Sequence, residues 1–424
     1  MRVLWVCNIM LPKIARALGR DAEPVGGWMS GLLDALEGSG TVIGVAYPSV
    51  GTETVQGMAG DTAYYSFCQP SPVLLSYDAG VEARLRGIIE AFQPDLLHIF
   101  GTEYVHSLAA VRAFGRPERT LIGIQGVLSA YAEHFMADVP LWVQKGRTFR
   151  DIVKRDNLIH QRESFLIRAE FEREALRRTG HVLGRTDWDK ACTEQINPRA
   201  RYHFGNEVLR DSFYEGEWEW ERCEKHSLFV SQGSYPIKGL HYVLKALPRI
   251  LEHYPDAKVY VAGGDITKKE TLQDRLRMSS YGKYICRLIE ENGLEGHVEY
   301  TGFLDEAAMK DRFLRSHVFV SPSSIENSPN SVGEAMLLGM PAVVSDVGGV
   351  KNLLTHEREG YLYQADAWYM IAYYVNKVFA MENEIQAMGA AARRRAQATH
   401  SREENSRALL AVYEELMENG HASE

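Results

Sequence analysis

Short apolar runs alternate with amphipathic segments along this chain, and this alternation constrains the fold more than any other feature. Runs too short to form helices begin near residues 3, 41, 96, 121 and 181, and the alternation restarts at residues 227, 258, 298, 318 and 341. Short apolar runs joined by helical segments are typical of parallel sheets that helices cover on both faces. The sequence therefore predicts an α/β fold with two doubly wound parallel-sheet domains.

The domain boundary is expected where neither a strand nor a helix period is visible. Residues 213–227, FYEGEWEWERCEKHS, are acidic and aromatic and follow neither period. We assign residues 1–210 to an amino-terminal domain and residues 211–399 to a carboxyl-terminal domain. Residues 400–424 are expected to form a helix that rejoins the amino-terminal domain.

Composition narrows the class of protein. The 424 residues carry 47 basic and 56 acidic side chains, a net charge of −9, which disfavours nucleic acid as the main partner. The five cysteines are odd in number and never spaced C-x-x-C, which disfavours a disulfide framework and a zinc site. No apolar stretch reaches the length of a membrane-spanning helix. We therefore expect a cytoplasmic protein.

One segment departs from the acidic balance of the chain. Residues 141–178 hold ten Lys or Arg against six Asp or Glu, and a helical period runs from residue 149 onward. One interpretation is a long surface helix with a solvated charged face, which is the commoner use of such runs. The other is a basic surface for anionic lipid or a lipid-linked acceptor, which would place the chain at the inner face of a membrane.

The most informative stretch is SPSSIENSPNSVGEAMLLGMPAVVS, residues 321–345. It follows a strand, runs into a helix and carries Glu326 and Glu334 eight positions apart. Asn330 or Ser331 could cap that helix, and Ser331 with Glu334 has the form of a capping box. Capping explains neither Glu326 nor the polar loop that follows it. Because a helix amino terminus favours phosphate, the two carboxylates are expected to flank a diphosphate and bind hydroxyls on either side.

This stretch resembles the retaining glycosyltransferases of family 4, which have the GT-B fold and the hallmark E-x7-E. The resemblance continues through VSDVGGVKNLL and EGYLY, in the order of the family. It implies two Rossmann-like domains that face each other across a cleft. It also implies that Glu326 lies beside the transferred sugar, that Glu334 binds the ribose, and that the amides of Asn330 and Ser331 meet the diphosphate.

A second segment, SLFVSQGSYPIKGLHYVLKAL from residue 227, resembles the strand–loop–KG element of the family, in which an Arg and a Lys hold the diphosphate. Lys238 matches the Lys, whereas Gln232 and Gly233 stand in the neighbourhood of the Arg. We take Gly233 as part of the donor loop. Arg185, in GRTDWD, is our candidate for the missing cation, and the alternative is a surface Arg at a strand end.

Two further elements of the amino-terminal half complete the expected donor site. Gly26 and Gly27 open the first helix, where the family places a glycine-rich loop against the donor phosphates; a dinucleotide site is disfavoured because the spacing is not G-x-G-x-x-G. Gln125 stands where family members commonly carry a His, so it could hydrogen-bond the sugar but not act as a base. Asp187-Trp188-Asp189 spells the D-x-D metal pattern of the other glycosyltransferase fold, but Thr186 is expected to cap a helix there.

The resulting expectation is a retaining, metal-independent glycosyltransferase that needs no cofactor. It would move a hexose-type sugar from a nucleotide sugar to a saccharide or a lipid-linked acceptor in polysaccharide or glycoconjugate synthesis. Two alternatives stay open: a sugar-nucleotide epimerase of the same fold, and a module that binds nucleotide sugars without turnover.

Overall fold

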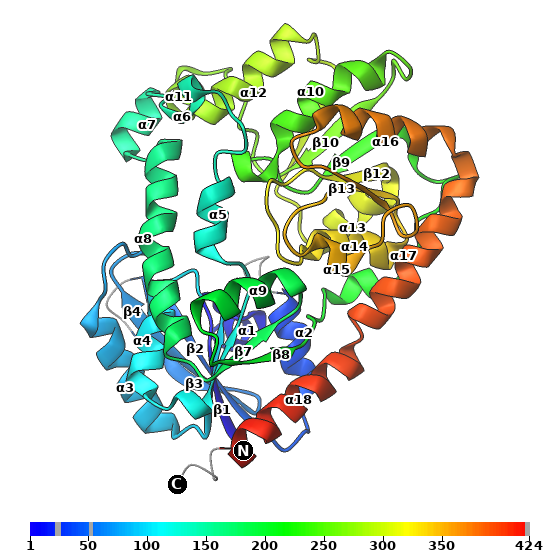
Figure 1. The fold of residues 1–424 in the computed structure, drawn as a ribbon. Coiled ribbons are helices and arrows are strands. Elements are labelled where there is room, and N and C mark those ends of the chain that lie inside the picture. The colour runs from blue at the N-terminus through cyan, green and yellow to red at the C-terminus, as the bar shows by residue number, and fades with distance from the viewer. Residues whose placement is uncertain (22–26, 51–53, 420–424) are drawn as a thin grey trace. The chain divides into compact units, whose positions relative to one another are not determined.

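A computed structural model describes residues 1–21, 27–50 and 54–419. It divides the chain into two compact units, each with one sheet (Figure 1). Unit 1 comprises Met1–Tyr131, Ser164–Leu209 and His400–Glu424; unit 2 comprises Ala132–Glu163 and Arg210–Thr399. The predicted division differs over residues 132–163, which belong with unit 2 and not with the amino-terminal domain.

Unit 1 is built on an eight-stranded sheet of order β3-β4-β2-β1-β5-β6-β7-β8, in which only β3 runs antiparallel to its neighbour. The strands are β1 Arg2–Val6, β2 Val42–Val50, β3 Gln56–Ala59, β4 Thr62–Gln69, β5 Leu96–Phe100, β6 Thr120–Gly123, β7 His181–Gly184 and β8 Arg201–Phe204. The helices of this half are α1 Pro12–Ala17, α2 Gly27–Leu36, α3 Ala79–Phe92, α4 Val105–Phe114, α5 Leu128–His134, α8 Leu158–Arg177, α9 Asp187–Ile196 and α18 Arg402–Asn419. The chain passes between the units four times: within α5, within α8, after Leu209 and after Thr399.

Helices cover both faces of this sheet because alternate strand residues are apolar on both sides. On β1, Val3 and Trp5 pack with α2 and α18, whereas Leu4 and Val6 pack with α3 and α4. The Tyr413 hydroxyl of α18 accepts a hydrogen bond of 3.0 Å from the Trp5 indole. The returning carboxyl-terminal helix is thus part of the core of unit 1.

Unit 2 is built on a six-stranded, wholly parallel sheet of order β11-β10-β9-β12-β13-β14. Its strands are β9 Glu224–Val230, β10 Lys258–Ala262, β11 Val298–Gly302, β12 Ser316–Ser321, β13 Ala342–Ser345 and β14 Tyr361–Tyr363. Its helices are α6 Leu141–Gln144, α7 Phe149–Lys154, α10 Leu240–Leu251, α11 Leu272–Arg277, α12 Ser280–Glu291, α13 Glu306–Arg315, α14 Asn330–Leu338, α15 Val350–Leu353, α16 Trp368–Ala380 and α17 Ile385–Thr399. The structure thereby confirms the predicted α/β class with two parallel-sheet domains.

One predicted helix is interrupted. The period from residue 149 predicts a continuous helix, but α7 ends at Lys154 and α8 begins at Leu158. Arg155 adopts a left-handed conformation with φ of 51°, and the Asn157 side chain accepts a hydrogen bond of 3.0 Å from the His160 amide. These two local features stop one helix and start the next.

Candidate functional site

The candidate site of unit 2 lies at the point where the order of its strands reverses. β9 is flanked by β10 and β12, and the chain continues outward in opposite directions from this centre. In open parallel sheets, ligands bind beside the carboxyl ends of the strands at such a point. The loop after β9 carries Lys238 and the loop after β12 carries Glu326, so the topology brings together two residues 88 positions apart.

A glycine lets these two loops approach each other closely. Lys238 ends a short 3-10 helix, Pro236–Lys238, and Gly239 follows it with φ of 72° before α10 begins. A Cβ atom at Gly239 would overlap the carbonyl oxygen of Pro322 in the loop after β12. Gly239 therefore permits both the left-handed turn and the contact that carries Lys238 to Glu326.

Lys238 and Glu326 form the centre of this site. The Lys238 ammonium donates to Oε1 of Glu326 at 2.5 Å, and the Ser323 hydroxyl donates to the same oxygen at 2.7 Å. Glu326 is 7% exposed. Burial by itself would lower the pKa of Lys238, but the Glu326 carboxylate and Tyr235 outweigh it and raise this pKa above its ordinary value. Lys238 is therefore held as a cation.

Glu334 has a partner that the sequence did not suggest. Arg210 donates to both of its oxygens, from Nε at 2.6 Å and from Nη2 at 2.7 Å, a two-point contact with a carboxylate that is 4% exposed. Burial raises the pKa of Glu334, and Arg210 offsets this rise only in part. No spacing rule connects two residues 124 positions apart, so only the fold reveals this pair.

The start of α14 differs from the capping interpretation. The helix begins at Asn330, its N-cap is Pro329, and none of the described side chains caps it. The alternative that Asn330, Ser331 and Glu334 serve only as a helix cap is thus not supported, because the carboxylate that would complete a capping box binds Arg210. A helix leaves its first amides without partners inside the helix, so Asn330 and Ser331 present donors at a positive helix end.

Gly233 has a close-packed place in the loop after β9. A Cβ atom there would come within 2.8 Å of the side chains of Leu240 and Val261. A larger residue would force these two side chains to shift, which gives Gly233 a packing role. Its predicted contact with the donor stays a prediction.

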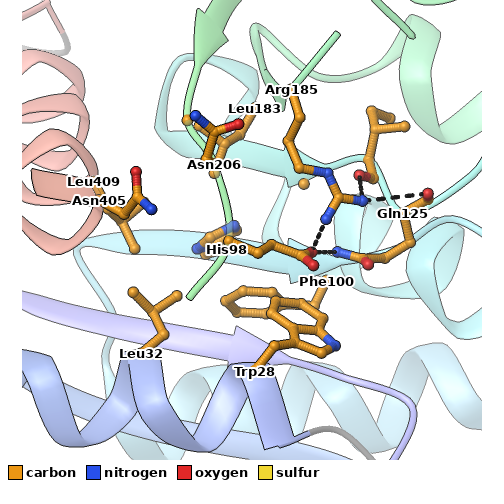
Figure 2. Close-up of a pocket in the computed structure, with 14 residues that line it drawn as sticks. Trp28, Leu32, His98, Phe100, Gln125, Leu183, Arg185, Asn206, Asn405 and Leu409 are labelled. Carbon is orange, nitrogen blue, oxygen red and sulfur yellow. Dashed lines mark hydrogen bonds and ion pairs between the residues drawn. The ribbon is translucent and has the colours of Figure 1, made fainter. Parts of the chain in front are cut away.

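Two other predicted residues lie together in unit 1, in a pocket at the ends of its central strands (Figure 2). Arg185 is 5% exposed, forms an ion pair with Glu207 and donates to the carbonyl oxygen of Ile124 at 3.3 Å. The Gln125 amide donates to Glu207 at 2.7 Å. Both side chains are thus held by one buried carboxylate, a partner that sequence reasoning missed.

The remaining predictions concern the first helix and the D-x-D triplet. Gly27 is the first residue of α2, whereas Gly26 lies outside the described residues. The predicted Thr186 cap is confirmed: its hydroxyl accepts from the Asp189 amide at 3.0 Å in a capping box. Asp189 also accepts a hydrogen bond of 2.5 Å from Tyr202, which commits this carboxylate to local structure.

Comparison with known sequences points to sugar transfer. Residues 215–395 match the family model described as glycosyl transferases group 1, which covers most of unit 2. An uncharacterized glycosyltransferase of Methanocaldococcus jannaschii, MJ1607, is 34% identical over 138 residues, 32% of this chain and 31% of that protein. A phosphatidyl-myo-inositol mannosyltransferase of Mycobacterium leprae is 27% identical over 148 residues, 34% of this chain and 35% of that protein. The chain thus matches about a third of the length of each of these relatives.

Solved structures show the same fold over nearly the whole chain. Sucrose-phosphate synthase from Thermosynechococcus elongatus has a TM-score of 0.68 at 14% identity and covers 99% of this chain and 100% of its own. HepE of Anabaena, solved with UDP-glucose, has a TM-score of 0.65 at 15% identity and covers 97% of this chain and 99% of its own. The fold is GT-B, and the matched carboxyl-terminal region supports a glycosyltransferase.

Proposed function

We propose that the protein is a retaining glycosyltransferase that moves a hexose-type sugar from a nucleotide sugar to an acceptor hydroxyl. The observation that carries this proposal is the convergence of Lys238 and Glu326 at the strand-order reversal of unit 2, next in sequence to α14. A fixed ammonium and a helix amino end suit a diphosphate. A buried carboxylate on either side suits hydroxyls.

The donor would bind with its diphosphate against the amides of Asn330 and Ser331 and against Lys238. Glu334, oriented by Arg210, would accept hydrogen bonds from the ribose, and Glu326 would meet the sugar. Gly233, Gly26 and Gly27 would line the phosphates. Gln125 would contact the sugar from unit 1, and Arg185 is the candidate second cation.

Catalysis would depend on stabilising the leaving diphosphate. A retaining mechanism with a covalent intermediate needs a free carboxylate near the anomeric carbon, and Glu326 is instead bound by Lys238 and Ser323. We therefore propose front-face attack, in which the leaving diphosphate accepts the proton of the acceptor hydroxyl. Lys238 and the α14 amides would stabilise the charge that develops on the diphosphate.

The substrate classes follow from the same residues and from the relatives. A nucleoside diphosphate sugar is the proposed donor, in line with the UDP-glucose bound to HepE. A saccharide or a lipid-linked saccharide is the proposed acceptor, and polysaccharide or glycoconjugate synthesis the proposed context. Because Lys238 supplies the positive charge, we expect transfer to proceed without a divalent metal and to survive EDTA.

A thermal-shift screen against UDP-, GDP- and ADP-sugars tests this proposal first, because a ligand that binds only the folded state raises the melting temperature. We expect one nucleotide class to stand out. Incubation of that donor alone should then yield slow hydrolysis; an epimerised sugar would support the isomerase instead. Tight binding with no turnover across saccharide and lipid-linked acceptors would support a binding module.

Two carboxylate variants separate the proposed roles. Glu326→Ala should impair transfer and leave binding of the free nucleotide largely intact, because Glu326 is assigned to the sugar. Glu334→Ala should weaken nucleotide binding itself, because Glu334 is assigned to the ribose. Isothermal titration with the free nucleotide distinguishes them, and equal losses in both variants would contradict the assignment.

A further inference from the structure

Apolar side chains gather on the outside of three short helices of unit 2. The exposed ones on α6, α7 and α11 are Leu141 (64%), Trp142 (46%), Phe149 (59%), Ile152 (60%), Val153 (65%), Leu272 (74%) and Leu276 (40%). α7 contacts α11, and α6 contacts α12, so the three helices lie at one end of the unit (Figure 1). Single exposed apolar residues are ordinary, but a contiguous group marks an interaction surface.

Basic side chains are interleaved with these apolar ones. Lys145, Arg147, Lys154 and Arg155 are exposed, and none of them forms an ion pair with the residues that the structure describes. Residues 141–155 hold five basic side chains and one acidic, in a chain whose net charge is −9. The positive charge is therefore concentrated on the same surface as the exposed apolar groups.

The inner faces of α6 and α7 are buried against unit 2. Val143 of α6 is fully buried, and the Thr148 side chain caps α7 by accepting from the Asp151 amide at 3.1 Å. Asp151 is 4% exposed and accepts a hydrogen bond of 3.0 Å from the amide of Ser280 at the start of α12. Buried contacts thus hold both helices against unit 2, so that their other, apolar face stays exposed in the folded protein.

We infer that the apolar–basic patch of α6, α7 and α11 docks on the interface of a membrane that contains anionic lipid. Short helices with aromatic and aliphatic groups beside Lys and Arg match the chemistry of this interface, where apolar groups enter the acyl boundary and cations meet the headgroups. Lys145 and Lys154 have long stems that can keep their ammonium groups in water. None of the helices in residues 1–21, 27–50 and 54–419 has the length and apolar character of a membrane span.

The patch also lies near the loop that carries Lys238. A cavity in unit 2 is lined by Arg150 and Asp151 of α7 and by Tyr235 and Pro236, which open the turn to Lys238. Docking would therefore hold the donor half of the protein at the bilayer surface. The inference goes beyond the proposed function, since lipid binding is measurable without any donor.

Flotation of the full chain with vesicles tests the inference. Vesicles of phosphatidylcholine with about 30% phosphatidylglycerol should bind the protein, and pure phosphatidylcholine should bind it at least tenfold less. The double variant Phe149→Ser/Ile152→Asn should bind the anionic vesicles at least about tenfold more weakly, because it removes two membrane-entering side chains. Lys145→Gln/Lys154→Gln should weaken binding by about fivefold per charge and reduce its salt dependence.

Matched controls come from the same chain. Tyr369→Ser/Tyr373→Ser removes two side chains of α16 that are equally exposed, at 57% and 59%, and should leave vesicle binding unchanged. Lys190→Gln/Lys258→Gln removes two exposed lysines outside the patch and should do the same. Equal binding to both vesicle types, or equal losses in patch and control variants, would overturn the inference. A dimer that forms without lipid and that Phe149→Ser/Ile152→Asn dissociates, as measured by sedimentation, would also overturn the inference. The patch would then bind a second copy of the chain.

Discussion

At the scale of single residues, Lys238 is the side chain on which the proposed chemistry depends most. Its ammonium is fixed by Glu326, and it is the cation that follows the central strand of unit 2. Loss of one group that stabilises developing negative charge typically lowers kcat about a hundredfold to a thousandfold. Lys238→Ala should therefore reduce turnover by that order, while the unpaired Glu326 carboxylate lowers the melting temperature without unfolding the protein at the assay temperature.

Single-turnover kinetics and thermal melting of the same preparation check this prediction. Lys351→Ala is the matched control, since Lys351 is exposed and pairs with Asp346 at 3.1 Å in the same unit. It should change neither quantity. Proportional losses of turnover and stability in Lys238→Ala would show that Lys238 is structural.

Arg210 offers a second prediction at this scale. It holds the buried carboxylate of Glu334 at two points, and breaking a buried pair typically costs about 3–5 kcal/mol because one charge is left unpaired. Arg210→Ala should lower the free energy of unfolding by that order and also weaken nucleotide binding. Arg210→Ala/Glu334→Gln should recover part of the stability but not the binding. Urea unfolding and calorimetric titration measure the two effects separately; no loss of stability in Arg210→Ala would contradict the pairing.

Glu172 gives a pH-dependent prediction. Burial raises its pKa from 4.5 to about 7. Hydrogen bonds from the Thr102 hydroxyl at 2.6 Å and the Leu128 amide at 3.0 Å lower this pKa but do not offset the effect of burial. The folded state therefore binds a proton that the unfolded state has lost, so this group lowers the free energy of unfolding as pH rises from about 4.5 to about 7. Glu172→Gln should be more stable than the native chain by about 2–3 kcal/mol at pH 8 and by much less at pH 5. A difference that does not change with pH would contradict it.

At the scale of elements, the turn between β9 and α10 positions the site. Gly239 has φ of 72°, and a side chain there would overlap the Pro322 carbonyl; Gly293 has φ of 63° with open space around it. Gly293→Ala should cost about 1–2 kcal/mol, the penalty of a left-handed alanine alone. Gly239→Ala should cost more and should also lower activity, because the loop that carries Glu326 must move. Equal costs by chemical unfolding, with full activity in both, would contradict the close contact.

The elements also show which parts of the fold could be predicted from the sequence. The start of strand β5 at Leu96 was predicted, because apolar periodicity reports burial directly. Lys238 and Glu326 lie close together because each follows a central strand, whereas their predicted contacts with a donor stay predictions. The partners Arg210 and Glu207 were missed, since they depend on pairing across long sequence separations. Residues 132–163 were predicted to belong to the amino-terminal domain, but they belong to unit 2. Contacts such as the hydrogen bond of 2.7 Å between the His241 ring and the Ala137 carbonyl join them to unit 2, and no sequence period indicates such a contact.

At the scale of the whole molecule, both units bury histidines that should make the protein sensitive to acid. Burial lowers the pKa of His98 and His106 in unit 1, and of His241 and His317 in unit 2, to about 3. The unfolded chain binds these protons near pH 6.5 and the folded chain does not, so the free energy of unfolding falls as pH drops from about 6.5 toward 3.

The acid sensitivity can be tested at one position. Nδ1 of His106 has no hydrogen-bond partner among the residues that the structure describes, and its ring stacks on Tyr104 at 5.4 Å, so a phenyl ring can take its place. His106→Phe should lose less stability than the native chain between about pH 7 and pH 5. His253→Phe, at an exposed position, should follow the native chain in the same urea titrations. If both variants track the native chain, burial of His106 does not contribute to acid sensitivity.

The central claim is that unit 2 binds the diphosphate of a nucleotide sugar at the start of α14. A crystal structure with the nucleotide that gives the largest thermal shift tests this claim most directly. We expect phosphate oxygens within hydrogen-bond distance of the Asn330 and Ser331 amides and of the Lys238 ammonium, with the ribose on Glu334. A nucleotide seated elsewhere, or a diphosphate that leaves Lys238 paired only with Glu326, would contradict it.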